Sequence, residues 1–343
     1  MKILNLYTKT IVTVFFVITF FSTSLAKSLD KYDKAEHISD YFSGILLLNE
    51  NKYEKSFNYL KKLNGLETNH TNYSVKYLYS LVNSGNIKKA FNYSNKLEEQ
   101  NLDSFESNLI LGVFHLKNSD MNLAQRYFVK AKSKKSSLIL DNFISNSLYN
   151  WSNLSNNSLY KASINLKKLD ERFENLKKIQ NIFLNCYFND QNTNNLFKEL
   201  TSSKNIDFSR YNYFHASFLV NSGDLKEAKE VIKSALTIHP RNLILNQYKL
   251  DLSKNKSISN FDCKNIDHVI AEILYIVSNA LSSQSIYPLS NFYLNLAKYL
   301  NKNFHSYDTL LAENFYKVEN FVEAKKIYNN LSKKGKAFLW YSS

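Results

Sequence analysis

The strongest constraint on this chain is a spacing: the small residues Ser56, Ala90 and Ala124 lie 34 residues apart, each within a similar local pattern. The three stretches read "NENKYEKSFNYLKKL", "NSGNIKKAFNYSNKL" and "NSDMNLAQRYFVKAK". In each of them apolar residues recur three and four apart after a polar turn, which indicates amphipathic helices. A fixed period of this length indicates stacked helix–turn–helix units. The sequence therefore predicts an all-α solenoid of antiparallel helix hairpins.

The period continues beyond the first three units, with interruptions. The clearest later unit, "RYNYFHASFLVNSGDLKEAKEVIKSALTIHPRN", contains Ala228, and Ser290 and Ala324 are again 34 residues apart. Residues 138–205 are degenerate, but two weak repeats fit there. We expect a first array at 27–252, a polar connector at 253–265 and a second array at 266–343, about nine units in all. Only six Gly and two Pro disfavour sandwiches, barrels and nucleotide-binding βαβ folds, which need both residues for turns.

The N-terminus has the pattern of a signal peptide. Lys2 and Lys9 form a basic region, "IVTVFFVITFF" an apolar core, and Ser24-Leu25-Ala26 a small-x-small cleavage site. We predict residues 1–26 to be a signal peptide cleaved after Ala26, which implies export to the periplasm. The apolar run is shorter than the roughly 20 residues that span a bilayer, so no stable membrane span is expected after cleavage. An uncleaved anchor is the alternative.

The charge and the two cysteines leave several interpretations open. The net charge of +14 is spread along the helices rather than clustered, which indicates a solvated basic face. Nucleic acid is therefore not expected as a partner, and attraction to anionic envelope surfaces is a weaker option. Export would permit a disulfide between Cys186 and Cys263. The other reading is that Cys186, which lies in the apolar stretch "NIFLNCYF", is a small buried residue.

The stretches "SGNIKKAFNY", "SGDLKEAKEVIKSALTIHPRN" and "VENFVEAKKIYNNL" resemble the tetratricopeptide repeat (TPR) family. "AEILYIVSNAL", "SNFYLNLAKYL" and "LLAENFYKVENFVEAKKIY" also resemble a class of exported alphaproteobacterial TPR proteins of unassigned activity. The resemblance covers nearly all of Ile38 to Leu331 and implies a right-handed superhelical, TPR-like α-solenoid. One departure is that the Trp of the family's first helices is replaced by Tyr, Phe or Leu.

The chain ends in "GKAFLWYSS", where a solenoid normally has a polar capping helix. The apolar residues Phe338, Leu339, Trp340 and Tyr341 allow two interpretations. Either this tail docks on the last repeat, or the second array is truncated and the chain is a fragment of a longer one.

The sequence contains no arrangement of residues that indicates catalysis or metal binding. The seven histidines show neither HExxH nor His-x-His spacing, and no cysteine lies near them. There is no glycine-rich phosphate loop and no G-x-S-x-G. His115 and His215 are predicted to be packed helix residues. No catalytic residue, metal ligand or cofactor is therefore predicted, and an enzyme is not expected.

A TPR-like array offers instead a concave groove lined by the first helix of each hairpin. Apolar and aromatic residues in such a groove suit an amphipathic helix or an extended peptide. The alternative is that they pack between neighbouring first helices, and Asn83 and Asn221 are predicted helix C-caps. The predicted groove residues are Tyr41, Ile45, Leu48, Val75, Tyr79, Val82, Leu109, Val113, Leu116, Tyr213, Ser217, Val220, Tyr275, Asn279, Glu313 and Tyr316.

The function expected from these features is a non-catalytic exported scaffold that mediates protein–protein or protein–peptide interaction in the cell envelope. Two alternatives stay open. The array could be the non-catalytic repeat arm of a larger enzyme whose catalytic domain lies beyond Ser343, or it could be a carbohydrate-binding or cell-wall-binding module that uses the groove tyrosines.

Overall fold

The structure, a computed structural model, describes residues 34–134, 139–203, 207–254 and 260–342. Within these ranges it is all-helical, with seventeen α-helices and no strand. The predicted signal peptide and residues 255–259 of the predicted connector lie outside the described residues. No helix in the described ranges combines the length and the apolar character that crossing a membrane requires.

The helices begin and end within about two residues of the periodic segments in the sequence, apart from 3₁₀ ends such as Lys61–Leu63. Their N-termini carry side-chain caps where the sequence provides them: Asp120 and Asp224 each accept a hydrogen bond from the backbone three residues later. The helices are α2 (Ala35–Asn49), α3 (Tyr53–Leu60), α4 (Thr71–Asn83), α5 (Ile87–Glu99), α6 (Phe105–Lys117), α7 (Met121–Ser133), α8 (Ile139–Ser152), α9 (Leu159–Lys167), α10 (Glu174–Tyr187), α11 (Thr193–Thr201), α12 (Tyr211–Asn221), α13 (Leu225–Ile238), α14 (Leu243–Ser253), α15 (Ile266–Ser283), α16 (Tyr287–Leu300), α17 (Ser306–Lys317) and α18 (Phe321–Ser332).

The 34-residue period is visible in the backbone of the turns between helices. At seven turns one residue has a φ between 56° and 87°, and the amide of the next residue donates to the carbonyl five positions earlier, as in a Schellman C-cap. Three of these residues are consecutive at the full period, and two further pairs repeat it. The left-handed residues are Asn51, Gly85 and Ser119, then Asn189 and Gly223, then Ser285 and Glu319.

The small residues of the repeat lie where two helices cross closely. Ser56 Oγ donates to the Gly44 carbonyl across the α2–α3 crossing at 2.7 Å, and Ala124 is fully buried between α6 and its neighbours. A Cβ atom added at Gly112 would lie 2.4 Å from the Phe128 ring. These positions therefore need small side chains, as the spacing predicts.

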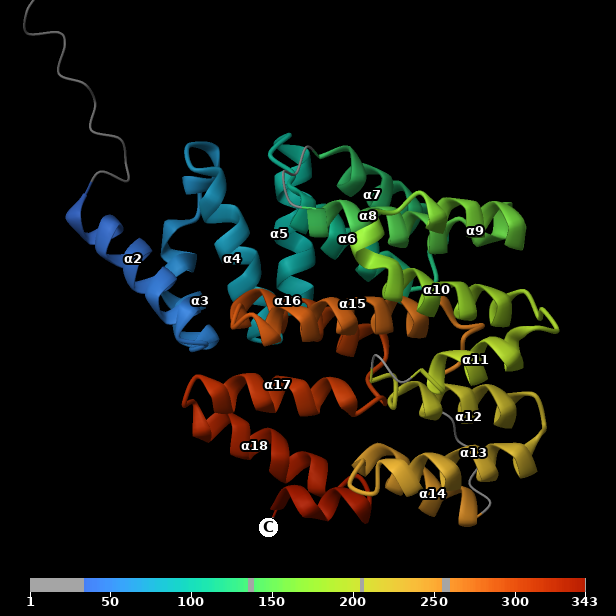
Figure 1. The fold of residues 1–343 in the computed structure, drawn as a ribbon. Helices are drawn as coiled ribbons and strands as arrows, with labels where there is room; N and C mark the ends of the chain where they lie inside the picture. The colour runs from blue at the N-terminus through green and yellow to red at the C-terminus, as the bar shows by residue number, and fades with distance from the viewer. Residues whose placement is uncertain (1–33, 135–138, 204–206, 255–259, 343) are drawn as a thin grey trace, which may run out of the picture.

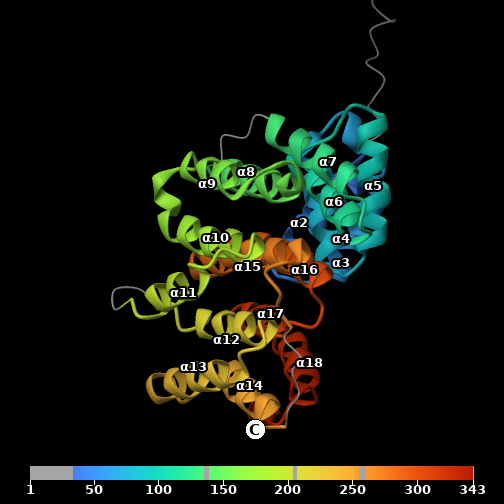
Figure 2. The ribbon, with the colours of Figure 1, turned by 90° about the vertical axis from the view of Figure 1, so that its right-hand side faces the viewer.

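α15 and α16 run across the middle of the molecule, with α4, α6 and α8 on one side and α12 and α17 on the other (Figures 1 and 2). α16 packs against α4 and α6, and α15 packs against α8 and α10. Both helices are buried nearly all round, with side chains such as Ile270, Leu274 and Phe292 inaccessible to solvent. The helices of the expected first array thus close around two helices of the expected second array.

The C-terminal tail, η5 (Ala337–Ser342), packs against α18 and α14. Phe338 is buried, and the Tyr341 ring stacks on Tyr328 with 5.2 Å between centroids. Leu339 and Trp340 remain 57% and 74% exposed. The tail therefore docks on the last helices through only part of its apolar surface.

Candidate functional site

The face on which the binding groove is predicted is covered by the chain's own C-terminal helices. Tyr79 on α4 contacts Phe292 on α16, with ring centroids 4.8 Å apart, and Phe114 on α6 stacks on Tyr299 at 6.2 Å. Apolar side chains from α4, α6 and α16 belong to a single buried cluster. The contacts that a bound helix would make in the groove are thus made by α16.

The predicted groove residues fall into three classes of burial. The seven buried ones, Leu48, Val82, Leu109, Val113, Leu116, Tyr213 and Ser217, cannot contact a partner in this conformation. Six others, Tyr41, Ile45, Val75, Tyr79, Val220 and Tyr275, are half-buried, and Asn279, Glu313 and Tyr316 are exposed. The structure does not bring the sixteen together: Tyr41 packs on a separate small cluster with Leu60, Leu63 and Tyr73.

Polar side chains hold α16 against the earlier helices. Asn83 Nδ2 donates to the Pro288 carbonyl at 2.9 Å, and Lys117 Nζ donates to the Leu300 carbonyl at 2.6 Å. The prediction that Asn83 caps α4 is wrong, because Ser84 occupies the cap position and Asn83 is the last helical residue. Its conserved length of side chain serves a long-range contact instead, one that sequence spacing cannot reveal.

A buried ion pair joins the segment before α12 to α15. The Arg210 guanidinium donates from Nε and Nη2 to the two carboxylate oxygens of Glu272 at 2.8 and 2.7 Å. The guanidinium also lies over the Tyr275 ring, 3.8 Å from its centroid. Burial raises the pKa of Glu272, and the charge of Arg210 and its hydrogen bonds act against that rise. Such a pair is stable only while both partners are present.

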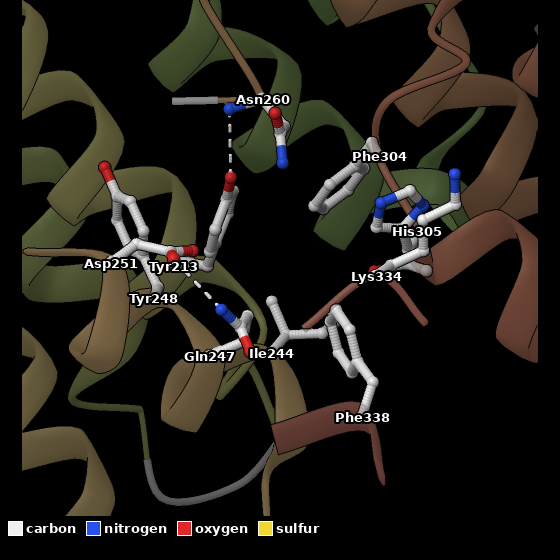
Figure 3. A pocket seen from close by; sticks show the side chains of 11 residues that line it. Tyr213, Ile244, Gln247, Tyr248, Asp251, Asn260, Phe304, His305, Lys334 and Phe338 are labelled. Carbon is white, nitrogen blue, oxygen red and sulfur yellow. Dashed lines mark hydrogen bonds between the residues drawn. The ribbon is translucent and has the colours of Figure 1, made fainter. Parts of the chain in front are cut away.

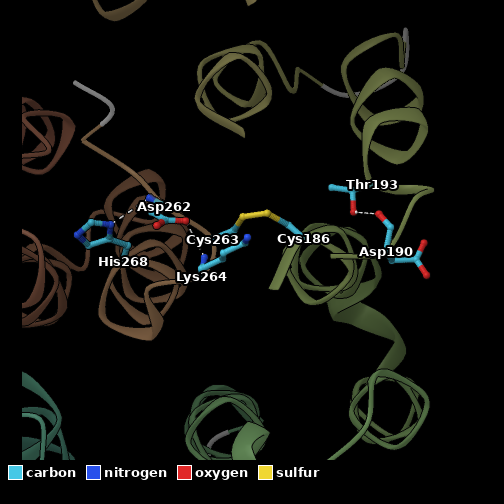
Figure 4. The surroundings of a disulfide bond; sticks show 7 residues. All are labelled: Cys186, Asp190, Thr193, Asp262, Cys263, Lys264 and His268. Atoms are coloured by element: carbon cyan, nitrogen blue, oxygen red, sulfur yellow. Dashed lines mark hydrogen bonds between the residues drawn. A yellow bond between two sulfur atoms is a disulfide. The ribbon is translucent and has the colours of Figure 1, made fainter. Parts of the chain in front are cut away.

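A disulfide joins Cys186 on α10 to Cys263, just before α15 (Figure 4). The two Cα atoms are 6.0 Å apart, within the usual range for a bridge. Both cysteines are buried, so the two interpretations left open by the sequence are compatible. The bridge fixes the segment that leads into α15 to the earlier helices.

A small polar cavity lies between α14, the start of α17 and the C-terminal tail (Figure 3). Its volume is about 70 Å³, enough for a few water molecules. Asp251, His305 and Ser306 line it together with Phe338. This cavity is well below the roughly 300–1,000 Å³ typical of ligand pockets, so it has the dimensions of a hydration site.

The histidines examined for chemistry lie apart from other ligating groups. His215 is buried with its Nε2 2.6 Å from Asn194 Oδ1, and burial lowers its pKa to about 4. It is therefore a neutral packed residue at pH 7. His115 is half-buried and stacks on Tyr127 at 5.4 Å. Across the described ranges, no three His, Cys, Asp or Glu residues converge in a way that could hold a metal ion.

A hollow of about 900 Å³ lies between α14 and the C-terminal tail. We call it the C-terminal hollow; it is lined by Pro240, Arg241, Leu243, Asn246, Lys249, Leu250, Lys336, Ala337, Leu339 and Trp340. Sequence analysis identified only its tail side, through the apolar run at 338–341. The residues of α14 carry no signal by themselves, because they meet the tail only after folding.

Comparisons with known proteins identify no relative. No family model matches the chain, and no curated protein matches it.

Proposed function

We propose that this chain is an exported, non-catalytic scaffold, a TPR-like right-handed superhelical solenoid of helix hairpins that binds another protein or peptide in the cell envelope. The observation that carries the proposal is the recurrence of one left-handed turn, with its Schellman hydrogen bond, at the 34-residue period. A helix pair repeated with the same turn is the building unit of a solenoid.

Two further observations support an exported protein. The first 26 residues have the three regions of a signal peptide. The Cys186–Cys263 disulfide suits an oxidising compartment, where such bridges persist.

The function is tested by expressing the chain with its own N-terminus and a C-terminal tag, crosslinking cells, and sequencing the recovered protein from its N-terminus. We expect a mature chain that begins at Lys27, found in the periplasmic fraction and crosslinked reproducibly to at least one envelope protein. An intact Met1 terminus in the cytoplasmic fraction would contradict export. A periplasmic chain without any crosslinked protein would contradict the scaffold function.

A further inference from the structure

The C-terminal hollow is an apolar surface built from two distant parts of the chain. Leu243 and Leu250 lie seven residues apart on α14, so they share one face of that helix. Both are half-buried and line the hollow. On the opposite wall, Leu339 and Trp340 of the tail are largely exposed. A large aromatic side chain beside an apolar recess is the arrangement found at the energetic centre of protein interfaces.

The charges around the hollow are all of one sign. Arg241 and Lys249 lie on the α14 wall and Lys336 on the tail wall, and all three side chains are exposed. No Asp or Glu lines the hollow. Among the ion pairs of the described residues, none involves these three cations. Their field is thus not neutralised by the protein, and it favours an anionic occupant.

We propose that the C-terminal hollow is the docking site for an acidic amphipathic segment of a partner protein, which rests on the scaffold function proposed above. The apolar face of the segment would cover Trp340 and reach Leu243 and Leu250, and its acidic residues would pair with Arg241, Lys249 and Lys336. The concave shape favours a single segment over a bilayer. A flat anionic membrane can meet the exposed Trp340 but cannot follow the surface down to the half-buried leucines.

The probe for this site is a fluorescently labelled helical peptide with Leu and Phe at positions i, i+3, i+4 and i+7 and Glu at the others. Binding to the purified mature chain is measured by anisotropy. We expect Trp340→Ala to weaken binding by about 30-fold, as for a central aromatic anchor. Lys249→Glu should weaken it by about tenfold, because an attraction becomes a repulsion.

Matched controls are available on other surfaces of the chain. Tyr160→Ala removes an aromatic side chain that is 77% exposed on α9, and Lys302→Glu makes the same charge change outside the hollow. Both should bind the peptide as the unchanged chain does, and all variants should keep its helical circular dichroism. A peptide with Lys in place of Glu should not bind.

Three outcomes would overturn the proposal. The first is no binding of the acidic peptide, and the second is equal binding by all four variants. The third is Trp340-dependent binding of vesicles containing phosphatidylglycerol without binding of the peptide, which would make the hollow a membrane contact. Crosslinking in cells separates this site from the function: a partner captured equally by Trp340→Ala leaves the scaffold function standing and removes the site.

Discussion

Replacing Arg210 by Met tests the role of the buried ion pair directly. Glu272 has no exposed surface, and both of its oxygens accept hydrogen bonds from Arg210. Loss of the guanidinium leaves a buried carboxylate without its counter-charge, and breaking such a pair costs about 3–5 kcal/mol. The double variant Arg210→Met with Glu272→Met removes both charges, and we expect its free energy of unfolding to lie within about 1 kcal/mol of the unchanged chain.

The pH dependence of the single variant gives a second, independent measure. Without Arg210, burial alone acts on Glu272 and raises its folded-state pKa further above the unfolded value of about 4.3. The folded state then holds a proton that the unfolded chain releases. The destabilisation should therefore be greatest at neutral pH and should shrink by about 1.4 kcal/mol for each pH unit between the folded-state pKa and about 4.3.

Urea unfolding followed by circular dichroism, at about pH 7 and about pH 5, measures both effects. A loss below about 1 kcal/mol, or an equal loss at the two pH values, would refute the reasoning that a charged Glu272 is buried here. The double variant serves as the control for side-chain volume, because it differs from the single variant only at residue 272.

Three further predictions test separate parts of the structure. Replacing Cys186 and Cys263 together by Ser should lower the free energy of unfolding by about 4 kcal/mol, because the bridge spans 77 residues of chain; an unchanged guanidinium midpoint in non-reducing buffer would contradict the bridge. Gly112→Ala should cost about 1–3 kcal/mol, since the new Cβ meets the buried Phe128 ring, and a thermal melt at the original temperature would show that the crossing is looser. The low pKa of His215 means that the unfolded chain takes up a proton first as the pH falls, so stability should decline by up to about 3 kcal/mol between about pH 6.5 and about pH 4. The non-titrating variant His215→Gln should lack that part of the decline, and a parallel decline in both proteins would contradict it.

The sequence predicted the helices well because each has its own local signal. The left-handed turn at Gly85 and the close crossing at Ala124 both follow from residue type and spacing. The position of α15 and α16 was missed, although a signal was present. Residues Val269 to Leu274 are buried in one run around the helix, and a helix that is apolar on all sides is a core helix.

The contacts that complete the structure could not be predicted, because they join residues far apart in the chain. Nothing near Glu272 in the sequence indicates that Arg210 is its partner, and the Asn83 contact with Pro288 depends on how the two arrays meet. The C-terminal hollow is similar. Trp340 stood out as an apolar end, but Lys249 reaches the same surface only through the packing of α14 against the tail.

Hydrogen exchange of the backbone amides in α15 and α16 tests most directly whether these helices form the core around which the others close. The mature chain in non-reducing buffer is exchanged near neutral pH, and protection is compared helix by helix. The structure predicts that α15 and α16 exchange as slowly as the most protected amides of α4 and α6. Faster exchange of α15 and α16, with α4 and α6 still protected, would show that the two helices leave the earlier ones and that the groove predicted from the sequence opens.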